Sequence, residues 1–436
     1  MAQRSRRMRL LYNILFPLLF VIGAPYYFWK LVRRGNWRPH FGERFGGYGQ
    51  LADKLKDQRV LWLHAVSVGE ANLAVQLVEA LQPQIVDWKI VVSTTTTTGR
   101  AELERKLPEG VRVVYYPIDW LPFVGRAFRA MNPAAIVLVE AEIWPNLFWQ
   151  ATRAKVPMHL VNARLSEKSA LGYEKWSFIF KPLFASLESV GVHHEADAKR
   201  LEAVGSDPGA ITVTGNLKFD QAASPPAGGV DAASVLAQLG VSERPVLLGG
   251  STFAGEEAIL AEHLPRWQEA CPELFLIVVP RHCERSAAVE AALQNVGLQV
   301  ARRTELENSP DKPDVLLVDT TGELKAFFEV ATIVFMGKSL TAQGGQNPIE
   351  PAAVGKPVVF GPFMQNFAAV TRQLLEAEGA VQVADEAELA AVVDQLLADE
   401  VRRQRLGAGA REVVEANQGA TQRTAEYLGK ALRALK

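Results

Sequence analysis

The amino-acid sequence predicts an α/β protein made of two doubly wound domains in tandem. From about Val60 onward, short apolar runs alternate with helix-compatible segments, which is typical of parallel sheets covered by helices. The alternation pauses at residues 222–231, AASPPAGGVD, where the composition is that of a linker, and then starts again. Two such domains place the carboxyl ends of their strands around a shared cleft, where sheets of this kind bind ligands.

The composition indicates a globular protein with ample core. The chain has 436 residues, 48% of them hydrophobic and 22% charged, which is enough for two or three domains. The formal net charge of −1 points to no particular partner, and we expect no nucleic acid among them. Cys271 and Cys283 are too few for a disulfide framework and fit a reducing compartment. Neither lies in a metal-binding pattern, so we expect both to be inert packing residues. We expect no metal ion and no other cofactor.

The N-terminal segment is strongly apolar. Leu10–Val32 is nearly long enough to cross a bilayer, for which about 20 apolar residues are needed. Arginines precede it, and Tyr26, Tyr27 and Trp29 lie beside basic residues at its end, as in an interfacial belt. A cleaved signal peptide is the alternative, but no small-residue cleavage site follows the apolar run. We expect a membrane anchor over residues 1–35, and the sequence leaves open whether it crosses the bilayer or enters one leaflet.

Each strand that we expect is followed by a helix-compatible segment. In the first half the expected strands are Val60–Val66, Lys89–Ser93, Arg112–Tyr116, Ala135–Val139, Met158–Val161, Ser189–Val192 and Ile211–Thr214. In the second half they are Pro245–Leu248, Leu274–Val279, Leu298–Ala301, Val315–Asp319, Ile333–Met336 and Pro357–Phe360. The last helices, near Glu386–Lys436, can pack on either half.

Glu70, in HAVSVGEANLA, stands where the first expected strand gives way to a helix. Gly69 permits a tight turn there, and a helix start favours a negative charge. We therefore expect the pKa of Glu70 to be lowered, which would keep the side chain ionised as a base. A glutamate at a helix start is common in any protein, so the motif by itself favours a structural role.

Three further motifs of the first half lie at strand ends. The threonines Thr94–Thr98 offer hydroxyls to sugar or phosphate oxygens, or simply cap a turn. Glu140 and Glu142 emerge from a buried strand in VEAEIWPN, where a carboxylate is seldom structural unless it is paired. Lys218, in TGNLKFD, lies close to the linker and alone is an ordinary solvated lysine. His193–His194 have no companion at metal-ligand spacing, so we expect loop histidines.

The second half carries residues suited to a nucleotide. Gly249–Gly250 followed by Ser251–Thr252 is a candidate phosphate cradle. It lacks the Walker lysine and the dinucleotide fingerprint, which argues against an ATPase or a dehydrogenase. Arg281 follows a strand and can pair with a phosphate. Asp319 ends another strand, after which the chain turns through Thr321, Gly322 and Glu323 into a helix.

The segment Gly344–Pro362, GGQNPIEPAAVGKPVVFGP, combines a glycine loop with a helix start. Asn347 is the expected N-cap, with Pro348 at the first helical position and Glu350 at the third, as in a capping box. The glycines allow a ligand close to the backbone, the helix start attracts an anion, and Glu350 can accept hydrogen bonds from ribose hydroxyls. An ordinary capped helix explains this spacing equally well.

The order of these motifs resembles that of a known family. SVGE, STTTTTGR, VEAEIWPN, NARLSEKS, TGNLKFD, GGST, VPRH, TGEL and GGQNPIEPAAVGKPVVFGP follow one another as in the 3-deoxy-D-manno-octulosonic acid (Kdo) transferases of lipid A assembly. The resemblance covers most of the chain, the anchor included. It implies a GT-B fold of two Rossmann-like domains, 36–222 for the acceptor and 223–436 for CMP-Kdo. It also implies an inverting, metal-independent transfer of Kdo from CMP-Kdo to the lipid A precursor lipid IVA at the cytoplasmic face of the inner membrane.

The same resemblance implies roles for individual residues. Glu70 matches the catalytic base, and Glu140 and Lys218 match residues that stabilise the transition state. The residues that match the CMP site are Pro280, Arg281, Thr321, Gly322, Glu323, Asn347, Pro348, Ile349 and Glu350. Thr321 stands where some members have methionine, and Phe253 and Ala254 depart from the family form GGSTHxGEE. These departures touch the lining of the donor pocket, and we do not expect them to abolish binding.

Two other functions share the predicted architecture. A sugar-nucleotide 2-epimerase also uses two such domains, but its soluble substrate gives no reason for a membrane anchor. A catalytically idle protein that binds the membrane surface would have no need of Glu70, Glu140 and Lys218 together. The number of Kdo units added in turn is left open by the sequence.

Overall fold

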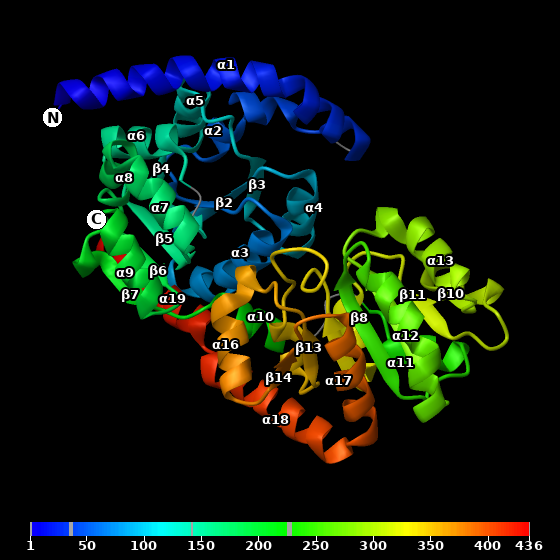
Figure 1. Cartoon of the computed structure of the whole chain (residues 1–436). Helices are drawn as coiled ribbons and strands as arrows, with labels where there is room; N and C mark the ends of the chain where they lie inside the picture. The colour runs from blue at the N-terminus through cyan, green and yellow to red at the C-terminus, as the bar shows by residue number, and fades with distance from the viewer. Residues whose placement is uncertain (1, 35–37, 141–142, 225–228, 436) are drawn as a thin grey trace. The chain divides into compact units, whose positions relative to one another are not determined.

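The protein folds into two compact units (Figure 1), and the computed structural model describes residues 2–34, 38–140, 143–224 and 229–435. Unit 1 comprises Met1–Leu217 and Gly419–Lys436, and unit 2 comprises Lys218–Gln418. Glu142 lies outside the described residues. The assignment of one predicted domain to the acceptor and the other to CMP-Kdo stays a prediction.

Unit 1 is built on a parallel sheet in the order β3-β2-β1-β4-β5-β6-β7. Its strands are β1 (Arg59–His64), β2 (Trp88–Thr94), β3 (Arg112–Tyr115), β4 (Pro133–Val139), β5 (Met158–Ala163), β6 (Ser189–Val192) and β7 (Ile211–Val213). Its helices are α1 (Ala2–Arg34), α2 (Leu51–Lys54), α3 (Val68–Leu81), α4 (Thr97–Lys106), α5 (Leu121–Met131), α6 (Pro145–Ala154), α7 (Glu167–Lys175), α8 (Ser177–Phe184), α9 (Glu195–Val204) and α19 (Ala420–Ala434).

Unit 2 repeats this plan in the order β10-β11-β9-β8-β12-β13-β14. Its strands are β8 (Val246–Thr252), β9 (Phe275–Pro280), β10 (Val300–Arg302), β11 (Val315–Leu317), β12 (Ile333–Met336), β13 (Val358–Phe360) and β14 (Ala380–Gln382). Its helices are α10 (Leu217–Ala223), α11 (Ala232–Gln238), α12 (Glu256–Ala270), α13 (Ser286–Asn295), α14 (Leu324–Val330), α15 (Ile349–Ala353), α16 (Ala368–Glu376), α17 (Glu386–Ala398) and α18 (Glu400–Asn417).

Each sheet has a hydrophobic core on both of its faces, because successive strand residues point in opposite directions. On β1, Val60 and Trp62 belong to one buried cluster, whereas Leu61 and Leu63 belong to another. Strands buried on both faces read as continuous apolar runs, which is why the sequence reveals them as strands of parallel sheets. The two parallel, helix-covered sheets confirm the predicted fold class.

Two features of the fold were not specified by the sequence pattern. The edge strand β14 is only three residues long and was not predicted. The final helix α19 belongs to unit 1, where Ala425, Leu428 and Leu432 join the buried cluster under α3. An amphipathic helix must bury its apolar stripe, but the stripe does not specify the surface that covers it.

Candidate active site

The carboxylate of Glu70 is buried at the start of α3, in the bend that follows β1. Its Oε2 accepts a hydrogen bond from the Val66 backbone N–H (2.8 Å) and its Oε1 accepts one from the Ser67 hydroxyl (2.8 Å). Ser67 is the N-cap of α3, and its oxygen accepts the Glu70 N–H (3.3 Å). Residues 67–70 match the S-x-x-E pattern of a capping box, which we did not predict there. Ser67 caps the helix as that pattern indicates, but the Glu70 carboxylate returns to the N–H of Val66 and not to that of Ser67, as a full capping box would require.

The predicted lowering of the Glu70 pKa is wrong. Burial raises the pKa of Glu70 above its ordinary value, and the nearby negative charge of Glu140 raises it further. The hydrogen bonds from Val66 and Ser67 lower the pKa, but by less than burial and Glu140 together raise it. The helix start is visible in the local sequence, but burial depends on the tertiary structure, which leaves only 8% of Glu70 exposed.

The threonine run fixes the peptide that holds Glu70. The hydroxyls of Thr94, Thr95 and Thr96 all lie within hydrogen-bond distance of the Val66 carbonyl oxygen (3.1, 3.4 and 3.3 Å). The Thr96 hydroxyl also accepts the Gly99 N–H (3.0 Å), which caps α4. For these three hydroxyls the structure therefore supports the capped turn rather than a row of free sugar-binding groups.

Glu140 follows the end of β4 in a conformation that is uncommon for a side chain with a Cβ. Its φ is 62°, in the left-handed region, and its N–H donates to the Val161 carbonyl (2.9 Å). Such a backbone persists only where its surroundings hold it, and it is frequent at functional sites. The Asn162 amide donates to Glu140 Oε1 (3.4 Å) and so fixes one of its oxygens.

Asn162 is a residue whose importance we did not anticipate, although it stands in the NARLSEKS motif. It is fully buried on β5 and also has a positive φ, of 53°. Its side-chain oxygen accepts the backbone N–H of Leu217 (3.0 Å) and lies 2.9 Å from Nε2 of His193. Asn162 thereby ties Glu140 to the residue that directly precedes Lys218. In the sequence, the role of Asn162 was indicated only by its position, as an amide directly after the predicted strand Met158–Val161.

Lys218 is half-buried near the start of α10 and is the first residue of unit 2. The bond between Leu217 and Asn162 fixes the backbone where this helix begins. His193 and His194 do have a companion, because Asp197 lies one helical turn along and offers an oxygen within 4.8 Å of both. That carboxylate pairs with Arg200 (3.2 Å), so its charge is already compensated.

In unit 2, Glu350 lies within the electrostatic reach of two cations. Burial raises the pKa of Glu350, whereas Lys325, the Asn347 amide and Arg281 lower it. Arg281 follows β9, and its backbone N–H donates to the Thr252 carbonyl (3.0 Å). The structure thus brings Arg281, Asn347 and Glu350 together, as the motifs predict for one binding site.

The predicted cap of the short helix α15 is displaced by one residue. Its N-cap is Pro348, and the helix begins at Ile349. Asn347 accepts the N–H of Ile349 (3.2 Å) and donates through its amide to Glu350 (3.2 Å), which is a local turn rather than a capping box. Gly345 has a positive φ of 74°, and a Cβ there would come within 2.4 Å of Met364 Sδ.

Three other expected nucleotide residues, Thr321, Gly322 and Glu323, lie in the turn between β11 and α14. The Thr321 hydroxyl donates to Cys283 Sγ (3.4 Å), two residues along the chain from Arg281, so the turn after β11 meets the one after β9. Glu323 is the N-cap residue of α14 and pairs with Arg303 (2.9 Å). Gly322 has a φ of 91°, which a glycine tolerates without strain.

The residues of the candidate phosphate cradle belong to β8 and are buried within unit 2. Gly249, Gly250, Ser251 and Thr252 are buried members of β8. Behind them, the fully buried Glu256 accepts four backbone N–H groups, those of Phe253, Lys338, Ser339 and Leu340 (2.7–3.0 Å). The loops after β8 and β12 are therefore organised by a carboxylate that we did not single out.

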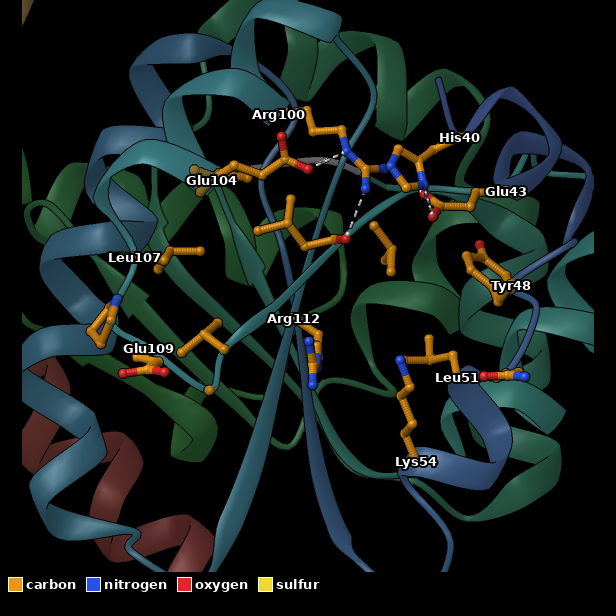
Figure 2. Close-up of a pocket in the computed structure, with 17 residues that line it drawn as sticks. His40, Glu43, Tyr48, Leu51, Lys54, Arg100, Glu104, Leu107, Glu109 and Arg112 are labelled. Carbon is orange, nitrogen blue, oxygen red and sulfur yellow. Dashed lines mark hydrogen bonds and ion pairs between the residues drawn. The ribbon is translucent and has the colours of Figure 1, made fainter. Parts of the chain in front are cut away.

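A cavity of about 520 Å³ lies elsewhere in unit 1, against the edge strand β3 (Figure 2). Arg100 lies at its upper rim in the picture and donates to Glu43 (2.6 Å), Glu104 (2.7 Å) and the Val113 carbonyl (3.2 Å). Glu43 also accepts the Tyr115 N–H (2.7 Å), so the pair satisfies backbone groups of β3. None of the predicted site residues lines this cavity.

Comparison with known proteins identifies the family. A family model described as 3-deoxy-D-manno-octulosonic-acid transferase (kdotransferase) matches residues 39–221. The 3-deoxy-D-manno-octulosonic acid transferase of Haemophilus influenzae is 32% identical over 91% of this chain and 92% of its own length. The transferase of the same name from Bordetella pertussis is 36% identical over 92% of this chain and 94% of its own length.

Solved structures of more distant proteins share the fold alone. HepE of Anabaena in complex with UDP has a TM-score of 0.58 at 14% identity, covering 86% of this chain and 100% of its own. A putative UDP-N-acetylglucosamine 2-epimerase of Listeria monocytogenes has a TM-score of 0.60 at 14% identity, covering 86% and 96%. Both are consistent with the GT-B architecture. On the two transferase relatives, the chain belongs to the Kdo transferase family of glycosyltransferases.

Proposed function

We propose that this protein transfers Kdo from CMP-Kdo to lipid IVA, the lipid A precursor, with inversion at the anomeric carbon and without a metal ion. The observation that carries the proposal is the Glu70 carboxylate, buried at the end of β1 and held by Val66 and Ser67. It supplies the base that an inverting transfer requires, in a chain that belongs to the family.

Glu70 would accept the proton of the attacking acceptor hydroxyl as that hydroxyl bonds to the anomeric carbon and CMP departs. A general base works best when its pKa is raised toward the working pH, because it then binds the proton more strongly. Burial and the charge of Glu140 raise the pKa of Glu70 in this direction. The threonine hydroxyls on Val66 keep the peptide that aims the carboxylate in one position, which reduces the reorganisation required during reaction.

The donor would bind in unit 2 through the residues that match the family's CMP site. Arg281 and Lys325 place positive charge near Glu350, which is consistent with a site that receives an anionic nucleotide and a ribose. Arg281 would pair with the phosphate, and Glu350 would accept a ribose hydroxyl. Pro280, Thr321, Gly322, Glu323, Asn347, Pro348 and Ile349 would line the same site. Glu140 and Lys218 would stabilise the transition state, Lys218 by offsetting negative charge of the donor.

The acceptor explains why the chain would work at a membrane. The helix α1 carries a candidate span, Met8–Tyr26, with a mean hydropathy of 1.6. A lipid acceptor is presented at a bilayer surface, so an apolar helix on the acceptor-binding unit would bring the enzyme to its substrate. We place this surface at the cytoplasmic side of the inner membrane, where basic flanks meet anionic head groups.

The test is the conversion of lipid IVA by the purified full-length chain with CMP-Kdo, followed by mass spectrometry of the lipid. We expect a mass increase of one or more Kdo units, formation of CMP, the inverted anomeric configuration and undiminished turnover in EDTA. Unchanged lipid, or retention of configuration, would refute the proposed transfer. A strict requirement for Mg²⁺ or Mn²⁺ would refute the metal-independent step. Epimerised sugar nucleotide without a lipid product would indicate the 2-epimerase alternative.

A further inference from the structure

The helix α1 is attached to unit 1 along one side. Between Arg9 and Tyr26, the residues that are only partly exposed are Arg9, Tyr12, Asn13, Phe16, Pro17, Phe20 and Ala24, which form a helical stripe. Arg9 and Tyr12 contact the ring of Trp149 on α6, and further along Phe28 contacts Phe41. In Figure 1 the helix, in blue, accordingly runs past α6 and α5 rather than away from them.

Polar groups of unit 1 bind Tyr12 and Asn13 of α1. The Tyr12 hydroxyl donates to the buried carboxylate of Asp119 (2.9 Å). The side-chain amides of Asn13 and Asn146 exchange two hydrogen bonds (3.0 and 3.1 Å), and the Leu121 N–H donates to Asn13 Oδ1 (3.2 Å). Asn13, which interrupts the apolar run, is thus satisfied by the globular part of unit 1.

Unit 1 also provides a hydrogen bond to the backbone of α1. Pro17 has no N–H, so the carbonyl of Asn13, four residues earlier, loses its partner within the helix. The indole N–H of Trp120 donates to that carbonyl (3.3 Å). In hydrocarbon an unpaired carbonyl costs several kcal/mol, so this bond matters most if α1 lies against lipid.

The opposite side of α1 is apolar and open. Its exposed residues are Leu10, Leu11, Ile14, Leu15, Leu18, Leu19, Val21, Ile22, Tyr26 and Trp29. Ile22, the most exposed of these, is 77% exposed, and Leu121 at the start of α5 continues the apolar surface beside Asn13. This set, with Leu121, is called the open face of α1 below.

The contacts of α1 are incompatible with a bilayer crossing. From Arg9 to Phe28 the helix rises by about 29 Å at roughly 1.5 Å per residue. The hydrocarbon core of a bilayer is also about 30 Å thick. If α1 crossed it, Asp119, Asn146 and Trp149 would have to lie at membrane depth with the globular unit around them.

We propose that α1 lies in the plane of the membrane, with its open face in the headgroup and upper acyl region of an anionic bilayer and its other side clamped to unit 1. The lipid composition follows from charge, since Arg4, Arg6, Arg7 and Arg9 precede the apolar run and Lys30, Arg33, Arg34 and Arg38 follow it. Helices that present an apolar face with basic residues at its ends bind such surfaces without spanning them when their other side is covered, as unit 1 covers that of α1. The inference rests on the proposed work at a membrane and adds the orientation of the bound enzyme.

Tag accessibility tests the orientation directly. The full-length chain would carry one epitope tag at each terminus, and protease would be added to spheroplasts and, separately, to inverted inner-membrane vesicles. An in-plane helix leaves both tags on one side, so both are digested in the same preparation and both are protected in the other. Tags digested in opposite preparations would show a crossing and overturn the proposal.

The open face is tested by charge placed on it. We expect Ile22→Glu to weaken partition into vesicles of phosphatidylethanolamine and phosphatidylglycerol about tenfold, the loss for one buried aliphatic side chain. The matched control is Val86→Glu, an exposed aliphatic residue of unit 1 in the loop before β2, which should bind as the unmodified chain does. Equal binding of Ile22→Glu and the unmodified chain would overturn the proposal.

The outcomes separate this inference from the proposed function. Kdo transfer measured on detergent-dispersed acceptor needs no bilayer, so its absence would refute the function without bearing on α1. Both tags on the periplasmic side would refute the proposed cytoplasmic location and still support an in-plane helix. Both tags on the cytoplasmic side together with Kdo transfer would support all three.

Discussion

Replacing Glu70 with glutamine separates the chemistry of this residue from its structural role. Glutamine keeps the size of the side chain and can still accept the Val66 N–H while its amide donates to Ser67 Oγ. Glu70 makes one hydrogen bond through each oxygen, so the exchange disturbs a single acceptor and should cost only about 1 kcal/mol of unfolding free energy. Loss of the general base should lower kcat by about 10²- to 10⁴-fold.

The assay is the rate of Kdo addition to lipid IVA, with CMP-Kdo binding measured separately by calorimetry. We expect Glu70→Gln to bind CMP-Kdo as the unmodified chain does, since the donor site is proposed in unit 2. Ser67→Ala is the matched control, because it removes the helix cap and one hydrogen bond to the carboxylate but keeps the carboxylate. It should lose about 0.5–2 kcal/mol of stability and remain within about tenfold of the normal rate.

The pH profile adds a second, independent readout. A carboxylate base must be deprotonated, so kcat/KM should fall on the acid side as Glu70 is protonated. Because Glu140 raises the pKa of Glu70, Glu140→Gln should lower that pKa and shift the acid limb to lower pH, whatever its effect on the maximum rate. A Glu70→Gln enzyme with near-normal turnover, or an acid limb that Glu140→Gln leaves in place, would refute Glu70 as the base.

Three further predictions concern residues that hold the backbone around Glu70, the loops after β8 and β12, and the contact of unit 1 with α1. Gly99→Ala should lower the free energy of unfolding in urea by about 1–3 kcal/mol and reduce kcat, because its Cβ would come within 2.7 and 2.8 Å of the Thr96 and Thr94 hydroxyls. Gly125→Ala is the control, since Gly125 has open space around it, and this change should be neutral or stabilising in the same measurement. Glu256→Ala should lower the free energy of unfolding by about 3 kcal/mol or more, since four backbone N–H groups lose their acceptor. Glu262 is exposed on the same helix, and Glu262→Ala should leave the free energy of unfolding unchanged. Burial raises the pKa of Asp119 to about 6, above its unfolded value of about 4, so stability should fall as pH rises between these values, and Asp119→Ala, although less stable throughout, should lose that slope.

The fold could be predicted because its strands are buried on both faces. Runs such as Val60–His64 and Ile333–Met336 are apolar without alternation, and each is followed by a helical segment. The three-residue β14 carries too little pattern to be recognised. The partner of α19 could not be predicted, because its apolar stripe would fit any apolar surface.

The sequence by itself determined the family, the two α/β halves and the strand ends at which Glu70, Glu140 and Arg281 stand. Only the tertiary structure decided their physical state. The pKa of Glu70 is raised because distant segments remove water from it, and no local spacing encodes that burial. In the same way, Asn13 reads as an interruption in an apolar run until Asn146 meets it across 133 positions of the chain. Hydrogen bonds and desolvation are properties of what surrounds a residue, and the fold supplies those surroundings.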